Sequence, residues 1–127
     1  MNEIVLDASA LLALLKAEVG ADVVAASLSR AVISTVNLSE VIAKLSETGI
    51  PEDAIRRAIT DLRIDVRPFD EEQAYQAGLL YHQTHGAGIS FGDRACLCLG
   101  KMLGAVVLTT DRIWVSLKIA VNVKLIR

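Results

Sequence analysis

Four carboxylates in this chain could form a site for phosphate chemistry if the fold brings them together. Asp7 and Asp111 each follow an apolar, strand-like run, Asp93 stands in the first turn of an apolar helix, and Glu40 is expected on a helix after another strand-like run. Carboxylates that meet beside a core repel each other and lose water, so a cation is their natural partner. The pattern therefore predicts a site for Mg²⁺ or Mn²⁺, and such a site suggests phosphate chemistry.

Each of these carboxylates also has a structural explanation. Asp7 could be the N-cap of a helix, and Asp111 could be a turn residue before a short helix. Asp93 lies three residues after Ser90, which is close to the spacing of a capping box. An exposed position is the usual explanation for a single helical Glu such as Glu40. The interpretation as a metal site rests on all four carboxylates having positions that the fold could bring together.

Two polar residues are expected to support the acidic site. Ser9 could donate a hydrogen bond to Asp7 or contact the metal, or it could satisfy the first turn of a helix. Asn37 lies three residues before Glu40, on the same helix face. That spacing suits an amide that orients a metal-binding carboxylate.

Hydroxyl and guanidinium groups next to the acids could contact a phosphate. Thr109 and Thr110 come before the fourth acid, and their hydroxyls could bind a water or a phosphate oxygen. Arg94 and Arg112 each follow an acid directly, so either could neutralise a scissile phosphate. Surface charge is the alternative role for both arginines.

The elements that must position these residues alternate between strand and helix. Strands are expected at residues 3–7, 31–35, 65–69, 105–108 and 121–125. Helices are expected at residues 8–16, 21–29, 36–48, 51–62, 70–85 and 90–103, with a helical turn at 113–117. Pro68 restricts its strand to an edge of the sheet. Apolar strands between helices predict an α/β fold with a mostly parallel sheet covered on both faces, and ligands gather at the carboxyl ends of such strands.

Length, composition and charge limit the class of protein. A chain of 127 residues predicts one domain, residues 1–127. Hydrophobic residues make up 53% of it, with a mean hydropathy of +0.46, and this excess predicts a surface for a partner. The net charge of −2 argues against tight, salt-dependent binding of nucleic acid, but not against a nuclease that holds one phosphate through a metal.

Neither a membrane span nor a secretory signal is expected. No apolar run approaches the roughly 18 residues that a spanning helix needs, and the N-terminus lacks the basic start of a signal peptide. We therefore expect a cytoplasmic protein that is not attached to a membrane.

Four segments resemble, in order, the acidic motifs of PIN-domain nucleases. They read LDASALLA at 6–13, STVNLSEV at 34–41, ISFGDRACL at 89–97 and LTTDRIW at 108–114. In length and motif order the chain is similar throughout to the VapC toxins of prokaryotic type II toxin–antitoxin systems. Each motif is short, but four in order over nearly the whole chain make a specific match.

The resemblance implies a PIN-like three-layer sandwich and a metal-dependent endoribonuclease. Its catalytic and metal-binding acids would be Asp7, Glu40, Asp93 and Asp111. The resemblance also implies a homodimer and a VapB-type antitoxin whose tail covers the acidic pocket, with DNA contacted only indirectly through that antitoxin. Residues 49–69 carry no family motif, and we expect these surfaces to set the choice of RNA.

Two alternatives to a nuclease follow from the same residues. A receiver-like signalling domain is also α/β and has an acidic magnesium pocket, but it needs adjacent acids after its first strand, and Asp7 has no acidic neighbour. It also needs a phospho-acceptor Asp at the end of a central strand, whereas Asp70 follows an edge-like strand. The other alternative is a non-catalytic PIN-like domain that only binds a partner, which the sequence leaves open.

Overall fold

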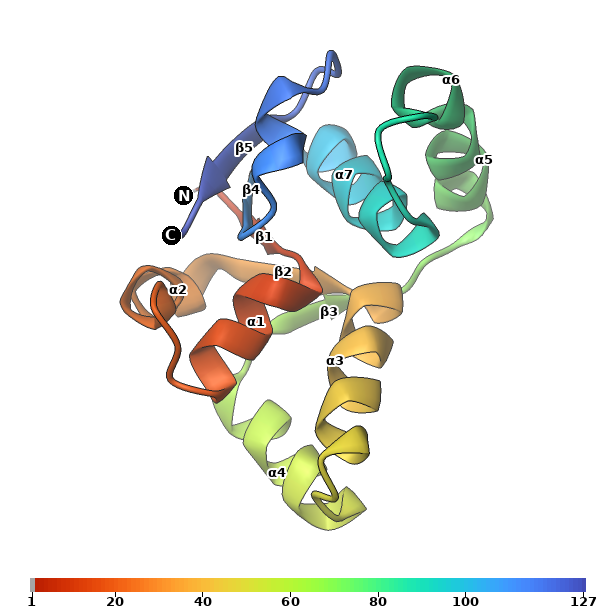
Figure 1. Ribbon diagram of the computed structural model, residues 1–127. Helices are drawn as coiled ribbons and strands as arrows, with labels where there is room; N and C mark the ends of the chain where they lie inside the picture. Colours follow the sequence, from red (N-terminus) through yellow and green to blue (C-terminus); the bar gives the residue numbers. More distant parts are fainter. Residues whose placement is uncertain (1) are drawn as a thin grey trace.

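A parallel sheet forms the centre of the molecule (Figure 1). The computed structural model describes residues 2–127. In that part of the chain the sheet has five strands, which are β1 (Ile4–Leu6), β2 (Ala31–Ser34), β3 (Asp65–Arg67), β4 (Val106–Thr109) and β5 (Asn122–Leu125). They lie in the order β3-β2-β1-β4-β5, and every neighbouring pair is parallel. The predicted α/β sheet is confirmed, with β3 at an edge as expected.

The helices connect consecutive strands. They are α1 (Ala8–Leu15), α2 (Ala21–Ser27), α3 (Thr35–Glu47), α4 (Glu52–Leu62), α5 (Glu71–Leu79), α6 (Tyr81–Thr84) and α7 (Phe91–Leu103), with 3₁₀ turns η1 (Leu28–Arg30) and η2 (Arg112–Ser116). None of the helices in residues 2–127 is both long and apolar enough to cross a membrane.

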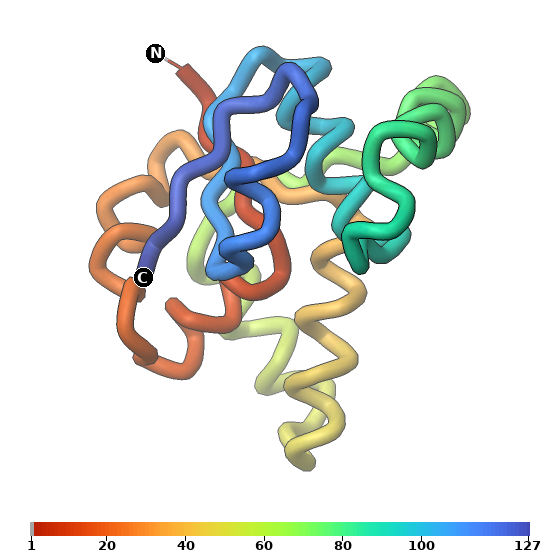
Figure 2. Tube along the Cα trace, turned by 45° about the horizontal axis from the view of Figure 1, so that its top comes forward, coloured from red at the N-terminus to blue at the C-terminus, as the bar shows by residue number. Residues whose placement is uncertain are grey.

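Helices cover both faces of the sheet, because alternate residues of each strand point to opposite sides. On β1, Ile4 and Leu6 belong to one buried cluster, and Val5 belongs to the other. The first cluster includes side chains of α1 to α4, and the second includes side chains of α5 and α7. This arrangement confirms the three-layer sandwich. Figure 2 shows that α3 and α4 extend together beyond the sheet.

Most expected boundaries differ from the structure by one or two residues, and two differences have a clear physical cause. The helix expected at residues 70–85 is divided into α5 and α6 at Leu80, which is buried; Gly78, in the last turn of α5, is a weak helix former. The strand expected to include Thr35 ends one residue earlier. Ser34 caps α3 there, because its hydroxyl accepts the N–H of Val36 at 3.1 Å.

The strand order reverses at β1, and the candidate site lies beside this reversal. The chain builds β1, β2 and β3 towards one edge, then returns to add β4 and β5 on the other side of β1. In open parallel sheets, ligands bind at the carboxyl ends of the strands beside such a reversal. Asp7 follows β1, and Asp111 lies two residues beyond β4.

Candidate active site

Asp7 is a buried carboxylate that caps α1 and is only 6% exposed. Its Oδ1 accepts hydrogen bonds from the Ser9 hydroxyl at 2.7 Å and the Ala10 N–H at 2.8 Å. Its Oδ2 accepts one from the Thr109 hydroxyl at 2.5 Å. Asp7 can therefore be both a helix cap and a site residue, because the capping hydrogen bonds fix its carboxylate at the end of β1.

Burial raises the pKa of Asp7 above its ordinary value. The hydrogen bonds from Thr109, Ser9 and Ala10 oppose that effect, and the charge of Asp93 adds to it. An acid that is harder to ionise when buried would be stabilised as the carboxylate by a cation.

Glu40 lies against the start of α7. The Nδ2 group of Asn37 donates to Glu40 Oε1 and to the carbonyl of Gly92, both at 2.9 Å. A Cβ added at Gly92 would overlap the Glu40 carboxylate. The missing side chain at Gly92 therefore makes room for Glu40, and Asn37 holds the two helices together at this point.

Asp93 forms a capping box with Ser90 at the N-terminus of α7. The Ser90 N–H donates to Asp93 Oδ2 at 3.0 Å, and the Asp93 N–H donates to the Ser90 hydroxyl at 3.1 Å. The dipole of α7 favours a negative charge at this end of the helix. The capping box leaves Asp93 on the wall of the pocket.

Asp111 caps η2, and its Oδ1 accepts the N–H of Ile113 at 3.0 Å. Thr109 connects this turn to the first acid, since its hydroxyl accepts the Asp111 N–H at 3.0 Å and donates to Asp7. The Thr110 N–H donates to the Ser9 hydroxyl at 3.0 Å. These bonds join the ends of β1 and β4 into one polar unit.

All four acids line a single pocket of about 330 Å³. Its lining consists of Asp7, Ala8, Ser9, Asn37, Glu40, Asp93, Thr110 and Asp111. Within residues 2–127, however, no three acidic, His or Cys side chains lie close enough to form a ready-made metal cage. The hydrogen bonds of the cap residues hold Asp7, Asp93 and Asp111 at the pocket wall, and like charges oppose a closer approach.

The donor set fits a hard divalent cation. Carboxylate and hydroxyl oxygens are the ligands that Mg²⁺ prefers, and no thiol or imidazole lines the described pocket. Asn37 adds a buried Oδ1 atom that has no hydrogen-bond partner. This acceptor belongs to a residue that lines the pocket and donates to Glu40, so the amide is part of the polar wall around the acids.

The two arginines expected near a phosphate lie outside this lining. Arg94 donates to the carbonyl of Ile89 at 3.1 Å, and its guanidinium lies 5.9 Å from the centre of the Tyr81 ring. Arg112 begins η2. A phosphate contact by Arg94 would require its side chain to leave these partners, and a phosphate contact by either arginine stays a prediction.

Two residues have a role in this geometry that the sequence did not predict. Thr109 was expected to face water or phosphate, but its side chain is fully buried and bonds to Asp7. Gly92 was expected only as part of a motif, and its contact with Glu40 depends on residues far apart in the chain. Register explains the first case, because Leu108 pairs with Leu6 and places Thr109 beside Asp7.

The chain belongs to the PIN domain family, which matches residues 4–119. This match confirms the family to which the four acidic motifs point. It also favours a PIN fold over the receiver-like alternative. A comparison of the sequence with curated proteins finds no match.

Solved structures share the fold at low sequence identity. A chain of the DNA-bound VapBC complex from Salmonella typhimurium is 18% identical, with a TM-score of 0.80 and complete coverage of both chains. A chain of the Klebsiella pneumoniae toxin–antitoxin complex is 13% identical, with a TM-score of 0.76 and 98% of each chain covered. A chain of promoter-bound VapBC2 from Rickettsia felis is 14% identical, with a TM-score of 0.75, covering 96% of this chain and 97% of the other.

Proposed function

We propose that this chain, as one PIN domain spanning residues 1–127, is a VapC-type toxin that cleaves RNA. The observation that carries the proposal is the pocket at the ends of β1 and β4, which is lined by four carboxylates from four separate parts of the chain. PIN-family membership and the shared fold with chains of VapBC complexes support it. It is an endoribonuclease dependent on Mg²⁺ or Mn²⁺ and acts in the cytoplasm.

The metal and the protein have separate tasks in this proposal. A divalent ion supplies a Lewis acid that polarises a phosphate oxygen and activates a water for attack on phosphorus. Asp7, Glu40, Asp93 and Asp111 would hold the ion, and the hydrogen bond from Asn37 would keep Glu40 in place at the pocket wall. Ser9 and Thr110 supply polar groups at the wall where the phosphate enters.

Charge determines how strongly the pocket holds a cation. Four ionised carboxylates carry four negative charges, and one divalent ion neutralises half of them. We therefore expect weak binding of a single ion, until the substrate brings a second ion or another cation helps. A basic side chain from a partner could occupy the pocket in place of the ion, which provides a physical basis for inhibition.

Cleavage of RNA tests the nuclease directly. Purified protein free of antitoxin would be incubated with a pool of tRNA, rRNA and mRNA, with Mg²⁺ or Mn²⁺ and separately with EDTA. Asp93→Asn is the matched variant, because Asn changes the charge and little else in shape. We expect discrete cuts that disappear with EDTA and with the variant. Folded, metal-loaded protein that cuts no RNA would instead favour the non-catalytic PIN-like alternative.

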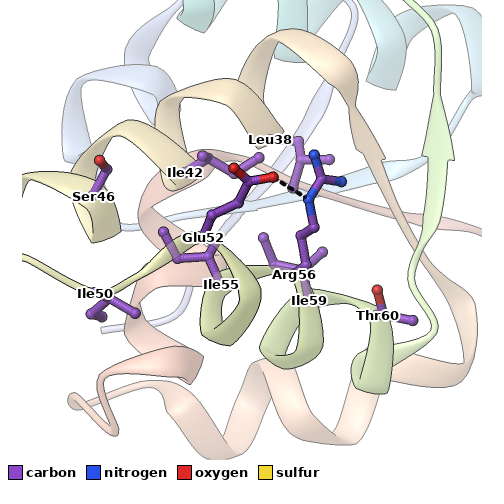
Figure 3. Close-up of a pocket in the computed structure, with 9 residues that line it drawn as sticks. All are labelled: Leu38, Ile42, Ser46, Ile50, Glu52, Ile55, Arg56, Ile59 and Thr60. Carbon is purple, nitrogen blue, oxygen red and sulfur yellow. Dashed lines mark hydrogen bonds and ion pairs between the residues drawn. The ribbon is translucent and has the colours of Figure 1, made fainter.

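A groove between α3 and α4 offers a surface for the antitoxin (Figure 3). Its volume is about 450 Å³, and its apolar lining consists of Leu38, Ile42, Ile50, Ile55 and Ile59. The ion pair between Glu52 and Arg56, at 2.8 Å, lies on its rim. We propose that an apolar helix of a VapB-type antitoxin occupies this groove.

The position of α3 connects this groove with the acidic pocket. Leu38, Ile42 and Ser46 follow one another at helical spacing along the groove, over roughly 12 Å of helix axis. Asn37 and Glu40, on the same helix, line the acidic pocket. A peptide whose helix lies in the groove could therefore extend along α3 and place a basic tail side chain among the carboxylates.

Co-purification tests this docking. The cognate antitoxin is expected from the gene next to the toxin gene, and Ile42→Lys should reduce its retention on the tagged toxin. Val115→Lys is the control, because Val115 is a 59% exposed apolar residue that does not line the groove. Equal retention by both variants would place the antitoxin elsewhere.

The chain is also proposed to form a homodimer, and to contact DNA only through the antitoxin. Exposed apolar side chains on α5, such as Tyr75 (63%) and Leu79 (61%), support a second protein surface. Sedimentation of the purified toxin tests the dimer, and a monomer at high concentration would contradict it. DNA binding by the toxin without antitoxin would contradict the indirect contact.

A further inference from the structure

Phe91 presents an exposed aromatic ring next to the acidic pocket. It is the first residue of α7 and is 53% exposed. It directly precedes Gly92, whose carbonyl accepts a hydrogen bond from Asn37, and stands two residues before Asp93. Since consecutive Cα atoms are about 3.8 Å apart, the ring is attached close to the wall of the pocket.

The ring is held in a defined orientation. Phe69 packs against it edge to face, with ring centres 5.5 Å apart and an angle of 89° between the planes. The Phe69 N–H donates to the hydroxyl of Thr35 at 3.1 Å, at the first residue of α3. The two rings therefore lie at the N-termini of the helices that supply Glu40 and Asp93. A ring positioned in advance loses little entropy when a flat ligand stacks on it.

Charge does not give this pocket affinity for a nucleic-acid strand. Four carboxylates line it, and no Lys or Arg does so among the described residues. The whole chain carries a net charge of −2. Basic side chains usually supply most of the affinity for phosphates. Stacking of a base on an aromatic ring needs no positive charge, and it suits single strands, whose bases are free.

We propose that Phe91 is a platform on which a nucleobase stacks beside the phosphate held at the acidic pocket. The proposal rests on the nuclease function, and it requires that the base next to the held phosphate is unpaired, because a base inside a duplex is not free to stack here. Phe69 positions the platform. Recognition by stacking is tolerant of sequence and favours bases that stack strongly, so purines bind more tightly than pyrimidines next to the pocket.

A double-mutant cycle between protein and RNA tests the platform. The probes are a labelled single-stranded oligoadenylate of about 15 nucleotides and an abasic ribose-phosphate strand of the same length. Binding is followed by fluorescence anisotropy in Ca²⁺, with the strands checked for cleavage afterwards. The proteins are wild type, Phe91→Leu, Phe91→Trp and the control Val19→Ala, which shortens a 76% exposed apolar side chain outside the pocket lining.

Stacking predicts a specific pattern across these pairs. Phe91→Leu should raise the Kd for oligoadenylate by roughly 5- to 100-fold and leave the Kd for the abasic strand unchanged. Phe91→Trp should restore binding, and Val19→Ala should bind like wild type. Equal binding of oligoadenylate by wild type and Phe91→Leu would overturn the proposal. Equal losses for both strands would also overturn it, because they would indicate a structural effect.

Failure of the platform and failure of the nuclease are distinguishable. If wild type and Phe91→Leu cleave the RNA pool with the same KM, the stacking proposal is wrong and the proposed nuclease function is supported. If wild type cleaves no RNA, the nuclease itself is wrong. If Phe91→Leu weakens binding of the antitoxin but not of RNA, the ring is a protein contact and the stacking proposal is overturned. Thermal unfolding and Mn²⁺ binding of each variant control for folding.

Discussion

Replacing Gly92 by Ala should separate stability from activity. A Cβ at this position would lie 2.7 Å from Glu40 Oε1, whereas ordinary contacts begin at 3.4 Å. The Glu40 carboxylate must therefore move by roughly 0.7 Å or more, away from the position where Asn37 holds it. Misplacement of a catalytic group by about 1 Å can cost about 100-fold in rate, so we expect RNA cleavage to fall by roughly 10- to 100-fold.

The fold should tolerate the same substitution. Ala is a better helix residue than Gly by about 0.5–1 kcal/mol, and Gly92 lies in the first turn of α7. The displaced carboxylate gives up one hydrogen bond, from Asn37, worth about 0.5–1.5 kcal/mol. The two terms offset each other, so the free energy of unfolding should stay within about 1 kcal/mol of wild type. Urea denaturation and RNA cleavage, measured on the same preparation, check both.

Two other glycines provide controls. A Cβ at Gly78, within α5, meets nothing within 4 Å, so Gly78→Ala should stabilise the protein slightly and leave cleavage unchanged. A Cβ at Gly100 would overlap a methyl group of Val107 in the core, so Gly100→Ala should destabilise it. If Gly92→Ala cleaves RNA as fast as wild type, cleavage does not depend on the position of the Glu40 carboxylate.

Three further predictions concern the buried end of β1. Asp7→Asn should keep the free energy of unfolding within about 1 kcal/mol of wild type, because Asn also caps helices, whereas Asp7→Ala should cost about 1–2 kcal/mol in urea denaturation. Thr109→Val should cost about 1–3 kcal/mol in the same assay, because it removes the donor to Asp7 and the acceptor of the Asp111 N–H; a neutral result would contradict that support. The pKa of Asp7 is raised in the folded state, so the folded protein binds this proton more tightly than the unfolded chain, and stability falls as pH rises through the raised pKa. In EDTA, wild type should therefore lose stability relative to Asp7→Asn as the pH rises from the ordinary pKa of an Asp through the raised pKa of Asp7, and a difference that does not change with pH would contradict the burial effect.

Local patterns were sufficient to predict the sheet and the placement of the acids. Asp7 was placed by the apolar run before it, and it lies at the end of β1 as expected. The spacing of Asn37 and Glu40 on one helix face predicted their contact, and the structure has that hydrogen bond. The spacing of Ser90 and Asp93 predicted the capping box, which is present. Each of these features depends on residues within four positions of each other.

Contacts between distant segments could not be predicted in this way. Thr109 bonds to Asp7 across 102 positions in the chain, and the link between Asn37 and Gly92 spans 55 positions. Both depend on which strand lies next to β1 and on how α7 meets α3. The sequence could not distinguish the hydroxyl of Thr109 from that of Thr110, because the register of β4 against β1 is fixed only in the fold.

Titration with Mn²⁺ measures whether the four carboxylates together hold a divalent cation. Calorimetric titration of wild type, Asp7→Asn and the control Asp65→Asn, which changes an acid paired with Arg67 outside the pocket, would be done at one pH. We expect one or two ions bound per wild-type chain, binding lost in Asp7→Asn, and binding kept in Asp65→Asn. Unchanged binding in Asp7→Asn, or none in wild type at millimolar Mn²⁺, would contradict this expectation.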